Sequence, residues 1–249
     1  IRRDFLPQDL APLLRKEELE GCVAVQVGQS NSETEFLLQL AESNDIIKGV
    51  VGWVDLKSPK LYDQLEVLAQ FELLKGFRHI VQVEPAGFLE QADFVRGVGQ
   101  LAAFDFTYDI LIYPHQLQEA YAFAKKIPNV RFVVDHLAKP YIRRGDIEQW
   151  KSDLRVLSQL PNVCCKVSGL VTEADWQLWK PADLTPYLDV AFEAFGTKRL
   201  MYGSDWPVCL VAADYGTVYG TIADYLAGFS ETERAAVLGN NAVRFYNID

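Results

Sequence analysis

The feature that most constrains this chain is an alternation, repeated along its length, between short apolar runs and longer amphipathic stretches. The short runs are rich in Val, Ile, Phe and Tyr and are bounded by Gly, Pro, Asn or Asp, which is the pattern of β-strands. They cover residues 21–27, 46–56, 73–81, 107–113, 130–136, 163–169 and 199–205. Several are apolar throughout, as expected for parallel strands covered on both faces.

The stretches between these runs have the period and the end signals of α-helices. The clearest cover residues 32–44, 114–129, 146–162, 183–196 and 231–248, and residues 2–21 form a further helix ahead of the first run. We expect Ser32 and Glu35 to form a capping box at the start of one of them. Another begins at Pro114 and ends in Lys125-Lys126, which suits the helix dipole.

Seven strand–helix repeats favour a (β/α)₈ TIM barrel whose first strand is missing from this sequence. A doubly wound sheet would carry a Gly-rich phosphate turn after an early strand, and GCVAVQVGQSNS at residues 21–32 is not one. No linker interrupts the repeats, so we expect one domain over residues 1–249. Because an open barrel exposes a strand edge, we expect the missing strand on a segment ahead of Ile1.

The composition excludes several kinds of partner. Asp and Glu number 34 against 24 Lys and Arg, a net charge of −10 that repels nucleic acid. No run of about 18 apolar residues is present, so we expect no membrane partner. The four cysteines contain no C-x-x-C pair, which favours a reducing, cytoplasmic location. A small-molecule substrate is the expected partner, and the sequence leaves a homo-oligomer open.

In a TIM barrel the functional groups lie at the carboxyl ends of the strands, and all three histidines fall there: His79, His115 and His136. A neutral His136 could orient a carbonyl, donate a proton or bind a metal. Asp205 ends the last run, where its carboxylate must be paired, metal-bound or functional, and its natural role is a general base on water. We expect Asp135 to point away from His136 and to pair with neighbouring helices.

Three charged or polar residues within the strands are candidates for binding substrate. Only one of Arg78 and His79 can face the barrel axis. An inward arginine would bind a carboxylate or polarised oxygen, with an ion pair at the barrel rim as the alternative. Lys166 lies in an apolar strand, so it either meets an acidic partner such as Asp205 or contacts substrate.

Two residues in the loops complete the candidates for substrate binding. His115 opens a helix, so it is either a substrate ligand or a helix cap. Trp206 follows the last strand, where its ring would suit a sugar, with simple packing as the alternative.

Four motifs together resemble those of a known family. They are VVDHLAKP, VCCKVSGL, LMYGSDWP and GNNAVRFYNI. The chain is similar, from Ile1 to Ile248, to the amidohydrolase-related family, and within it to bacterial sugar lactonases acting on L-fucono- or L-rhamnono-lactone. The resemblance implies a distorted TIM barrel in which Asp205 activates water and His136 assists at the carbonyl. Arg78 matches the arginine that this family has after its fourth strand.

One departure from the family pattern concerns metal binding. Family members carry a His-x-His pair on the first strand, and this sequence has none. We expect that pair, like the missing strand, ahead of Ile1. In metal-dependent relatives the pair helps to hold a divalent ion. The sequence therefore leaves open whether a metal such as zinc is bound, with His136 and Asp205 as its ligands if so.

These observations predict a hydrolase that opens a sugar-acid lactone by attack of Asp205-activated water on the ring carbonyl. Two alternatives stay open at this point. One is a metal-dependent decarboxylase of the same superfamily, and the other is a non-catalytic barrel that binds sugar acids.

Overall fold

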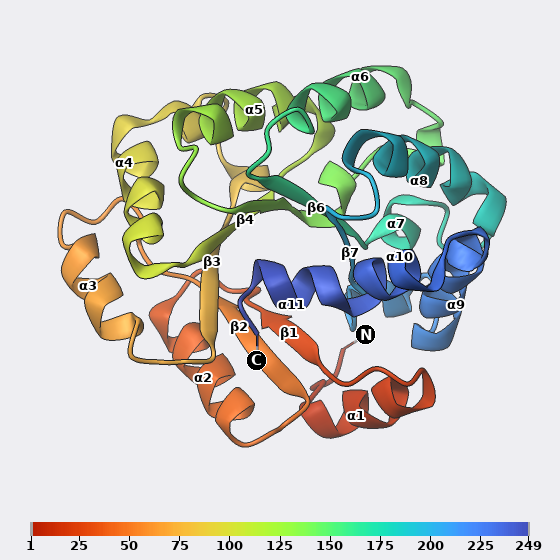
Figure 1. The fold of residues 1–249 in the computed structure, drawn as a ribbon, viewed down its shortest axis with the longest axis horizontal. Helices are drawn as coiled ribbons and strands as arrows, with labels where there is room; N and C mark the ends of the chain where they lie inside the picture. The colour runs from red at the N-terminus through yellow and green to blue at the C-terminus, as the bar shows by residue number, and fades with distance from the viewer. Residues whose placement is uncertain (1, 249) are drawn as a thin grey trace.

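The computed structural model describes residues 2–248 and arranges them as a curled layer of strands with helices around it (Figure 1). Within these residues seven strands pair in chain order, and every pair is parallel. They are β1 (Cys22–Val25), β2 (Ile47–Gly52), β3 (Leu74–Ile80), β4 (Thr107–Leu111), β5 (Phe132–Val134), β6 (Val163–Val167) and β7 (Leu200–Tyr202). All seven predicted strands are confirmed.

The order of the strands leaves β1 and β7 at the two edges of the sheet within residues 2–248. The expected first strand, with its His-x-His pair, would precede Ile1 and lies outside the described residues. The parallel order and the covering helices confirm the predicted α/β barrel class.

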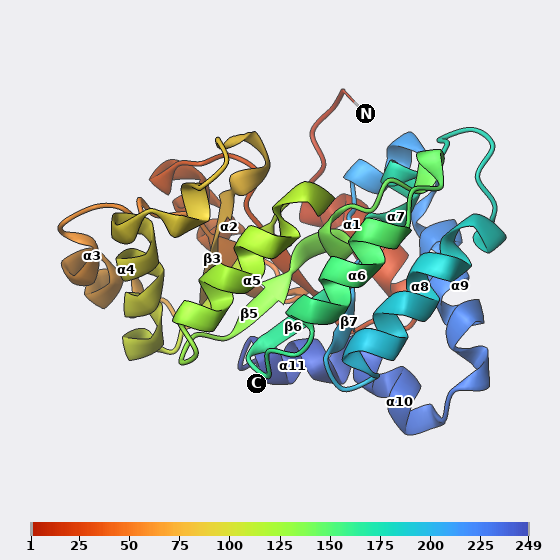
Figure 2. The same ribbon diagram turned by 90° about the horizontal axis from the view of Figure 1, so that it is seen from above.

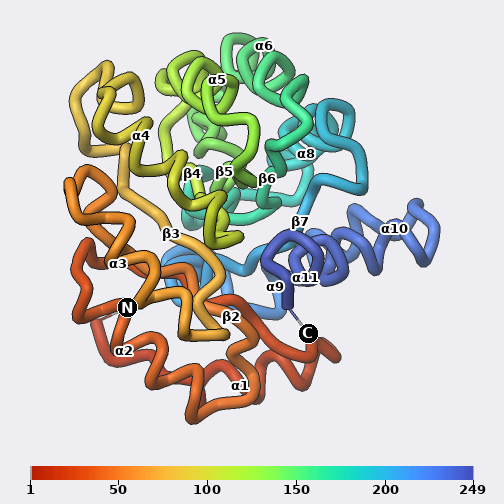
Figure 3. The backbone as a smooth tube through the Cα atoms, turned by 60° about the vertical axis from the view of Figure 1, so that its left-hand side comes forward, coloured from red at the N-terminus to blue at the C-terminus, as the bar shows by residue number. Residues whose placement is uncertain are grey.

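The helices surround the outside of the strands (Figure 3). They are α1 (Pro7–Lys16), α2 (Asn31–Glu42), α3 (Leu61–Leu68), α4 (Ala92–Gln100), α5 (Leu117–Lys126), α6 (Glu148–Leu157), α7 (Leu170–Glu173), α8 (Pro181–Phe195), α9 (Tyr215–Tyr225), α10 (Glu231–Ala235) and α11 (Asn241–Phe245). The capping box predicted at Ser32 and Glu35 is wrong. Ser30 caps α2 instead, accepting from the Glu33 N–H at 3.2 Å, because the backbone is still extended at Ser30. No helix of the described chain has the length and apolar character needed to cross a membrane.

Strand residues alternate between the helix layer and the barrel interior. Tyr108 and Phe132, paired across β4 and β5, pack outward against helix residues such as Phe123. Their neighbours Asp109 and Val133, also paired, face inward. Inward positions therefore carry both apolar and charged side chains, and the charged ones lie beside the candidate active site.

The carboxyl-terminal segment closes the end of the barrel at which the strands begin (Figure 2). Phe245 and Tyr246 pack inside the barrel with Val51, Val133 and Met201. The Lys75 ammonium, near the start of β3, donates to the backbone carbonyl of residue 247 at 2.8 Å. The strands terminate at the opposite end of the barrel, which is where functional residues lie in TIM barrels.

Candidate active site

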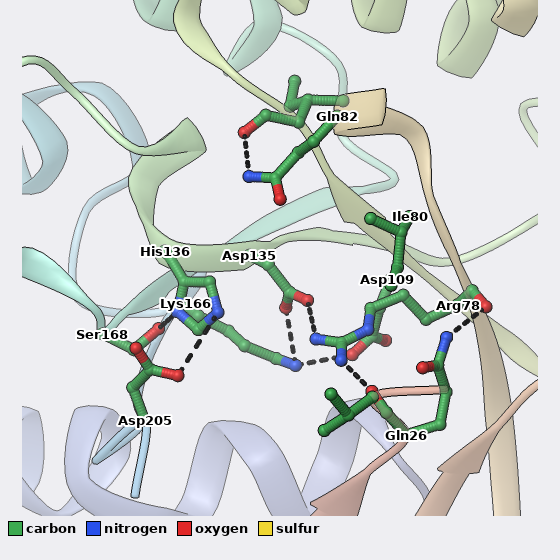
Figure 4. A network of polar contacts seen from close by, with 12 residues as sticks. Gln26, Arg78, Ile80, Gln82, Asp109, Asp135, His136, Lys166, Ser168 and Asp205 are labelled. Carbon is green, nitrogen blue, oxygen red and sulfur yellow. Dashed lines mark hydrogen bonds and ion pairs between the residues drawn. The ribbon is translucent and has the colours of Figure 1, made fainter. Parts of the chain in front are cut away.

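His136 and Asp205 lie together at the carboxyl ends of the strands (Figure 4). His136 follows β5 and Asp205 follows β7, and Nε2 of the histidine lies 3.7 Å from Oδ1 of the aspartate. Their side chains are only 13% and 12% exposed, so water screens the pair weakly. The structure thus brings together the two residues that the sequence places in the catalytic role.

The surroundings of His136 keep its imidazole neutral. Burial lowers the pKa of His136, and the opposing effect of the Asp205 and Asp135 carboxylates does not restore it. The Nδ1 atom lies 2.8 Å from the Ser168 hydroxyl oxygen. We assign the ring proton to Nε2, on the side of the Asp205 carboxylate, so that Ser168 donates to Nδ1. The N–H of His136 and the carboxylate of Asp205 then face each other.

One oxygen of the Asp205 carboxylate lacks a partner within residues 2–248. Its Oδ2 atom is buried and has no hydrogen-bond partner among the described residues. A buried acceptor without a partner is rare in a stable fold and marks a position suited to a ligand or water.

Both side chains are presented from strained backbone. Asp205 has φ +53°. His136 begins a run of four non-glycine residues in the left-handed region: His136 (φ +52°), Leu137 (+52°), Ala138 (+57°) and Lys139 (+52°). Each such residue costs about 1–2 kcal/mol, and strain of this kind concentrates at functional sites.

A buried ionic network lies in the barrel interior beside this pair (Figure 4). Asp135 pairs with Arg78 at 2.9 Å and with Lys166 at 2.8 Å, and Lys166 also contacts Asp109 at 2.5 Å. Arg78 in addition donates to the backbone carbonyl of Gln26. Two cations and two carboxylates therefore balance one another inside the barrel.

One sequence-based expectation about this network is wrong. Asp135 does not pair with neighbouring helices, because it lies two residues after the inward Val133 and so faces the interior. Lys166 meets an acidic partner as one alternative required, but the partners are Asp109 and Asp135 rather than Asp205. For Arg78, the structure shows the ion-pair alternative.

The network keeps Lys166 charged. Burial tends to lower the pKa of Lys166, but the adjacent Asp109 and Asp135 carboxylates outweigh it and raise that pKa well above its usual value. Burial, helped by the charge of Asp135, raises the pKa of Asp109 to about 6. Burial also acts to raise the pKa of Asp135, but Lys166 and Arg78 overcome it and hold this pKa below its usual range.

The three remaining candidates for substrate binding make no contact with the His136 or Asp205 side chains among the interactions of the described residues. His79 faces the helix layer, where it lies 2.8 Å from Glu84 and stacks on Phe88. His115 is exposed and stacks on the neighbouring Tyr113. Trp206 follows Asp205 directly and packs edge-on against Phe5. Substrate roles for these three remain predictions.

Asp109 is the residue of this candidate site's network that sequence reasoning missed. It lies in the apolar run 107–113, and a carboxylate in such a run needs a buried partner, by the same logic that singled out Lys166. That signal was present in the sequence.

The described residues do not complete a metal site. His136 and Asp205 supply two ligand groups, and no cluster of three or more His, Cys, Asp or Glu side chains suited to a metal occurs within residues 2–248. A catalytic zinc has three protein ligands.

A parallel barrel with a buried imidazole–carboxylate pair at the ends of its strands defines a TIM-barrel enzyme. The chain belongs to the amidohydrolase family, whose sequence profile matches residues 1–248. A protein of Burkholderia multivorans named L-fucono-1,5-lactonase is 41% identical over 99% of this chain and 87% of its own length. Another of that name, from Burkholderia ambifaria, is 36% identical over 100% of this chain and 87% of its own.

A solved structure supports the same fold. A crystal structure of an amidohydrolase from Burkholderia multivorans with bound zinc has a TM-score of 0.94 and 42% identity. The match covers 99% of this chain and 90% of that one. The fold is therefore an amidohydrolase-type TIM barrel.

Proposed function

We propose that this protein is a lactonase, a hydrolase that opens the ring of a sugar-acid lactone. The observation that carries the proposal is the buried pair of His136 and Asp205 at the carboxyl ends of β5 and β7. The full-length similarity to two proteins named L-fucono-1,5-lactonase makes that lactone the first candidate substrate.

In the proposed reaction Asp205 acts as the general base. Its unpartnered Oδ2 takes a proton from water, and the water oxygen bonds to the ring carbonyl carbon. The Nε2–H of His136 donates to the carbonyl oxygen as it becomes negative. The bond between the carbonyl carbon and the ring oxygen then breaks, and the ring oxygen takes the proton from Asp205. One water is consumed and one hydroxy acid is formed.

The charges around the pair favour a neutral substrate. Lys139 and Arg78 are cations whose charges act on His136. Both are already occupied, Lys139 by Glu173 at 2.9 Å and Arg78 by Asp135 at 2.9 Å. Asp205 therefore leaves the site negative, and a substrate carboxylate would be repelled.

This charge pattern of the side chains would assist the proposed lactonase after reaction. The hydroxy acid product ionises at neutral pH, and its new negative charge lies close to Asp205, which favours release.

A panel of lactones tests the proposal. The protein is assayed with a pH indicator against L-fucono-1,5-lactone, L-rhamnono-γ-lactone and lactones that carry a carboxylate, with spontaneous hydrolysis subtracted. We expect turnover of the neutral sugar lactones and a kcat/KM at least about tenfold lower for the charged ones, a difference of roughly 1.4 kcal/mol.

Two results would contradict the proposal. Tight binding of sugar lactones with no acid released, measured by calorimetry, would favour the non-catalytic barrel. Release of CO₂ from carboxylated substrates without lactone hydrolysis would favour the decarboxylase.

A further inference from the structure

A short segment after β6 contacts both ends of the turn that carries His136. Ser168, directly after β6, places its hydroxyl 2.8 Å from Nδ1 of His136. Glu173, the last residue of α7, accepts from the Lys139 ammonium at 2.9 Å. Residues 168–173 therefore hold the first and the last residue of the left-handed turn.

The left-handed turn requires stabilising contacts, because four consecutive non-glycine residues disfavour left-handed backbone. Inside the turn the Lys139 N–H donates to the His136 carbonyl at 2.8 Å. The Trp150 indole donates to the Leu137 carbonyl at 2.7 Å. The contact from Lys139 to Glu173 is a further constraint on the far end of the turn.

The contact between Lys139 and Glu173 is suited to this purpose. The two side chains are only 17% and 21% exposed, so their attraction is screened less than that of a surface ion pair. The corner before α7 is also close to the imidazole, since a Cβ at Gly169 would lie 2.8 Å from the His136 ring. The Thr172 hydroxyl donates to the Gly169 carbonyl at 2.7 Å and stiffens that corner.

We propose that Glu173 is a positioning residue, which acts through Lys139 to fix the turn and so the direction of the His136 imidazole. The side chain of Glu173 need not touch substrate. Its effect on turnover rests on the proposed lactonase function, whereas its effect on the imidazole does not.

The kinetic test replaces Glu173 with Gln, which keeps the shape and removes the charge. We expect kcat for L-fucono-1,5-lactone to fall by about 10- to 100-fold, as small misplacements of catalytic groups do, with KM within about twofold of wild type. The reversed pair Lys139→Glu with Glu173→Lys is expected to recover part of that loss. The matched control is Glu193→Gln, which breaks the ion pair with Arg155 between α6 and α8 and should leave kcat unchanged.

The second test observes the imidazole directly. Because the sequence has three histidines, the ring signals of ¹⁵N-labelled protein can be assigned one by one. We expect Glu173→Gln to shift or broaden the signals of His136 and to leave those of His79 and His115 in place. An unchanged His136 signal together with an unchanged kcat would overturn the inference, and so would equal changes at all three histidines, which would indicate a general loss of structure.

The two proposals fail in different ways. If the wild-type protein hydrolyses no lactone, the proposed function fails, while the imidazole signals still test the role of Glu173. If the wild type is active and Glu173→Gln matches the Glu193→Gln control in rate and in spectrum, only the positioning role is lost.

Discussion

Asp205 carries a charge that no Lys or Arg in the described residues neutralises. The His136 imidazole lies 3.7 Å from the carboxylate, and its lowered pKa keeps it neutral near pH 7. A buried carboxylate without a cation is costly to the fold, so its retention fits a chemical role rather than a structural one.

Replacing Asp205 with Asn tests this role. The amide keeps the shape but cannot accept a proton, so kcat for the lactone should fall by about 10²–10⁴-fold. The urea midpoint should stay the same or rise, since a buried charge has been removed. The control is Asp214→Asn at the N-cap of α9, where Asn caps as well as Asp and activity should persist. Near-normal turnover by the Asp205 variant would rule out the proposed base.

The buried imidazole of His136 predicts how stability depends on pH. Its pKa is lower in the folded protein than the usual 6.5, so the unfolded chain binds the proton first as pH falls. The contribution of His136 to stability is therefore full above pH 6.5 and is lost below it. We expect the free energy of unfolding, from urea titrations, to fall more between pH 7 and pH 5 in wild type than in a His136→Gln variant. An equal fall in both would contradict the lowered pKa.

At the scale of the element, the strands were predictable and their ends were not. The run 130–136 predicted a strand up to His136, yet β5 stops at Val134. Beyond it Asp135 pairs with Arg78, which is 57 residues away in sequence, and the backbone then turns left-handed. Local propensity contains no information about a partner so distant. The same limit explains why the need of Lys166 for a partner was evident but the identity of that partner was not.

Helix α4 offers a matched pair of glycines for a test of close packing. A Cβ at Gly97 would lie 1.7 Å from the Leu56 carbonyl oxygen, whereas one at Gly99 would lie 3.7 Å from Ile127. We expect Gly97→Ala to lower the free energy of unfolding by about 1–3 kcal/mol through overpacking. Gly99→Ala should instead stabilise by up to about 1 kcal/mol through helix propensity. Urea denaturation of both variants checks this, and equal effects would show that α4 does not pack closely on Leu56.

At the scale of the whole molecule, the two ends of the barrel are connected through its charged interior. Tyr246, just after α11, donates to Asp109 at 2.9 Å across 137 residues of sequence. Asp109 contacts Lys166, which contacts Asp135, the residue before His136. The end of the chain thus supports the network beside the candidate site. Such long-range contacts are what the predicted single domain over residues 1–249 requires, and that domain assignment remains a prediction.

Replacing Tyr246 with Phe tests this connection, because the ring is kept and only the hydroxyl donor is lost. The pKa of Asp109 is raised to about 6 in the fold, so the carboxylate needs its donors mainly above that pH. Loss of a hydrogen bond to a buried charge costs about 1.5–3 kcal/mol, and loss of one to a neutral group about 1. The variant should therefore lose more unfolding free energy at pH 8 than at pH 5.

The matched control for this change is Tyr225→Phe. The Tyr225 hydroxyl donates to Asp189 at 2.8 Å on the surface between α9 and α8, where water can replace it. We expect that variant to lose less than about 1 kcal/mol. Urea denaturation at pH 8 and pH 5 measures the unfolding free energy that each variant loses. If the Tyr246→Phe variant lost no more unfolding free energy at pH 8 than at pH 5, the Tyr246 hydroxyl would not stabilise the Asp109 carboxylate, and the interior charges would not depend on the carboxyl-terminal segment.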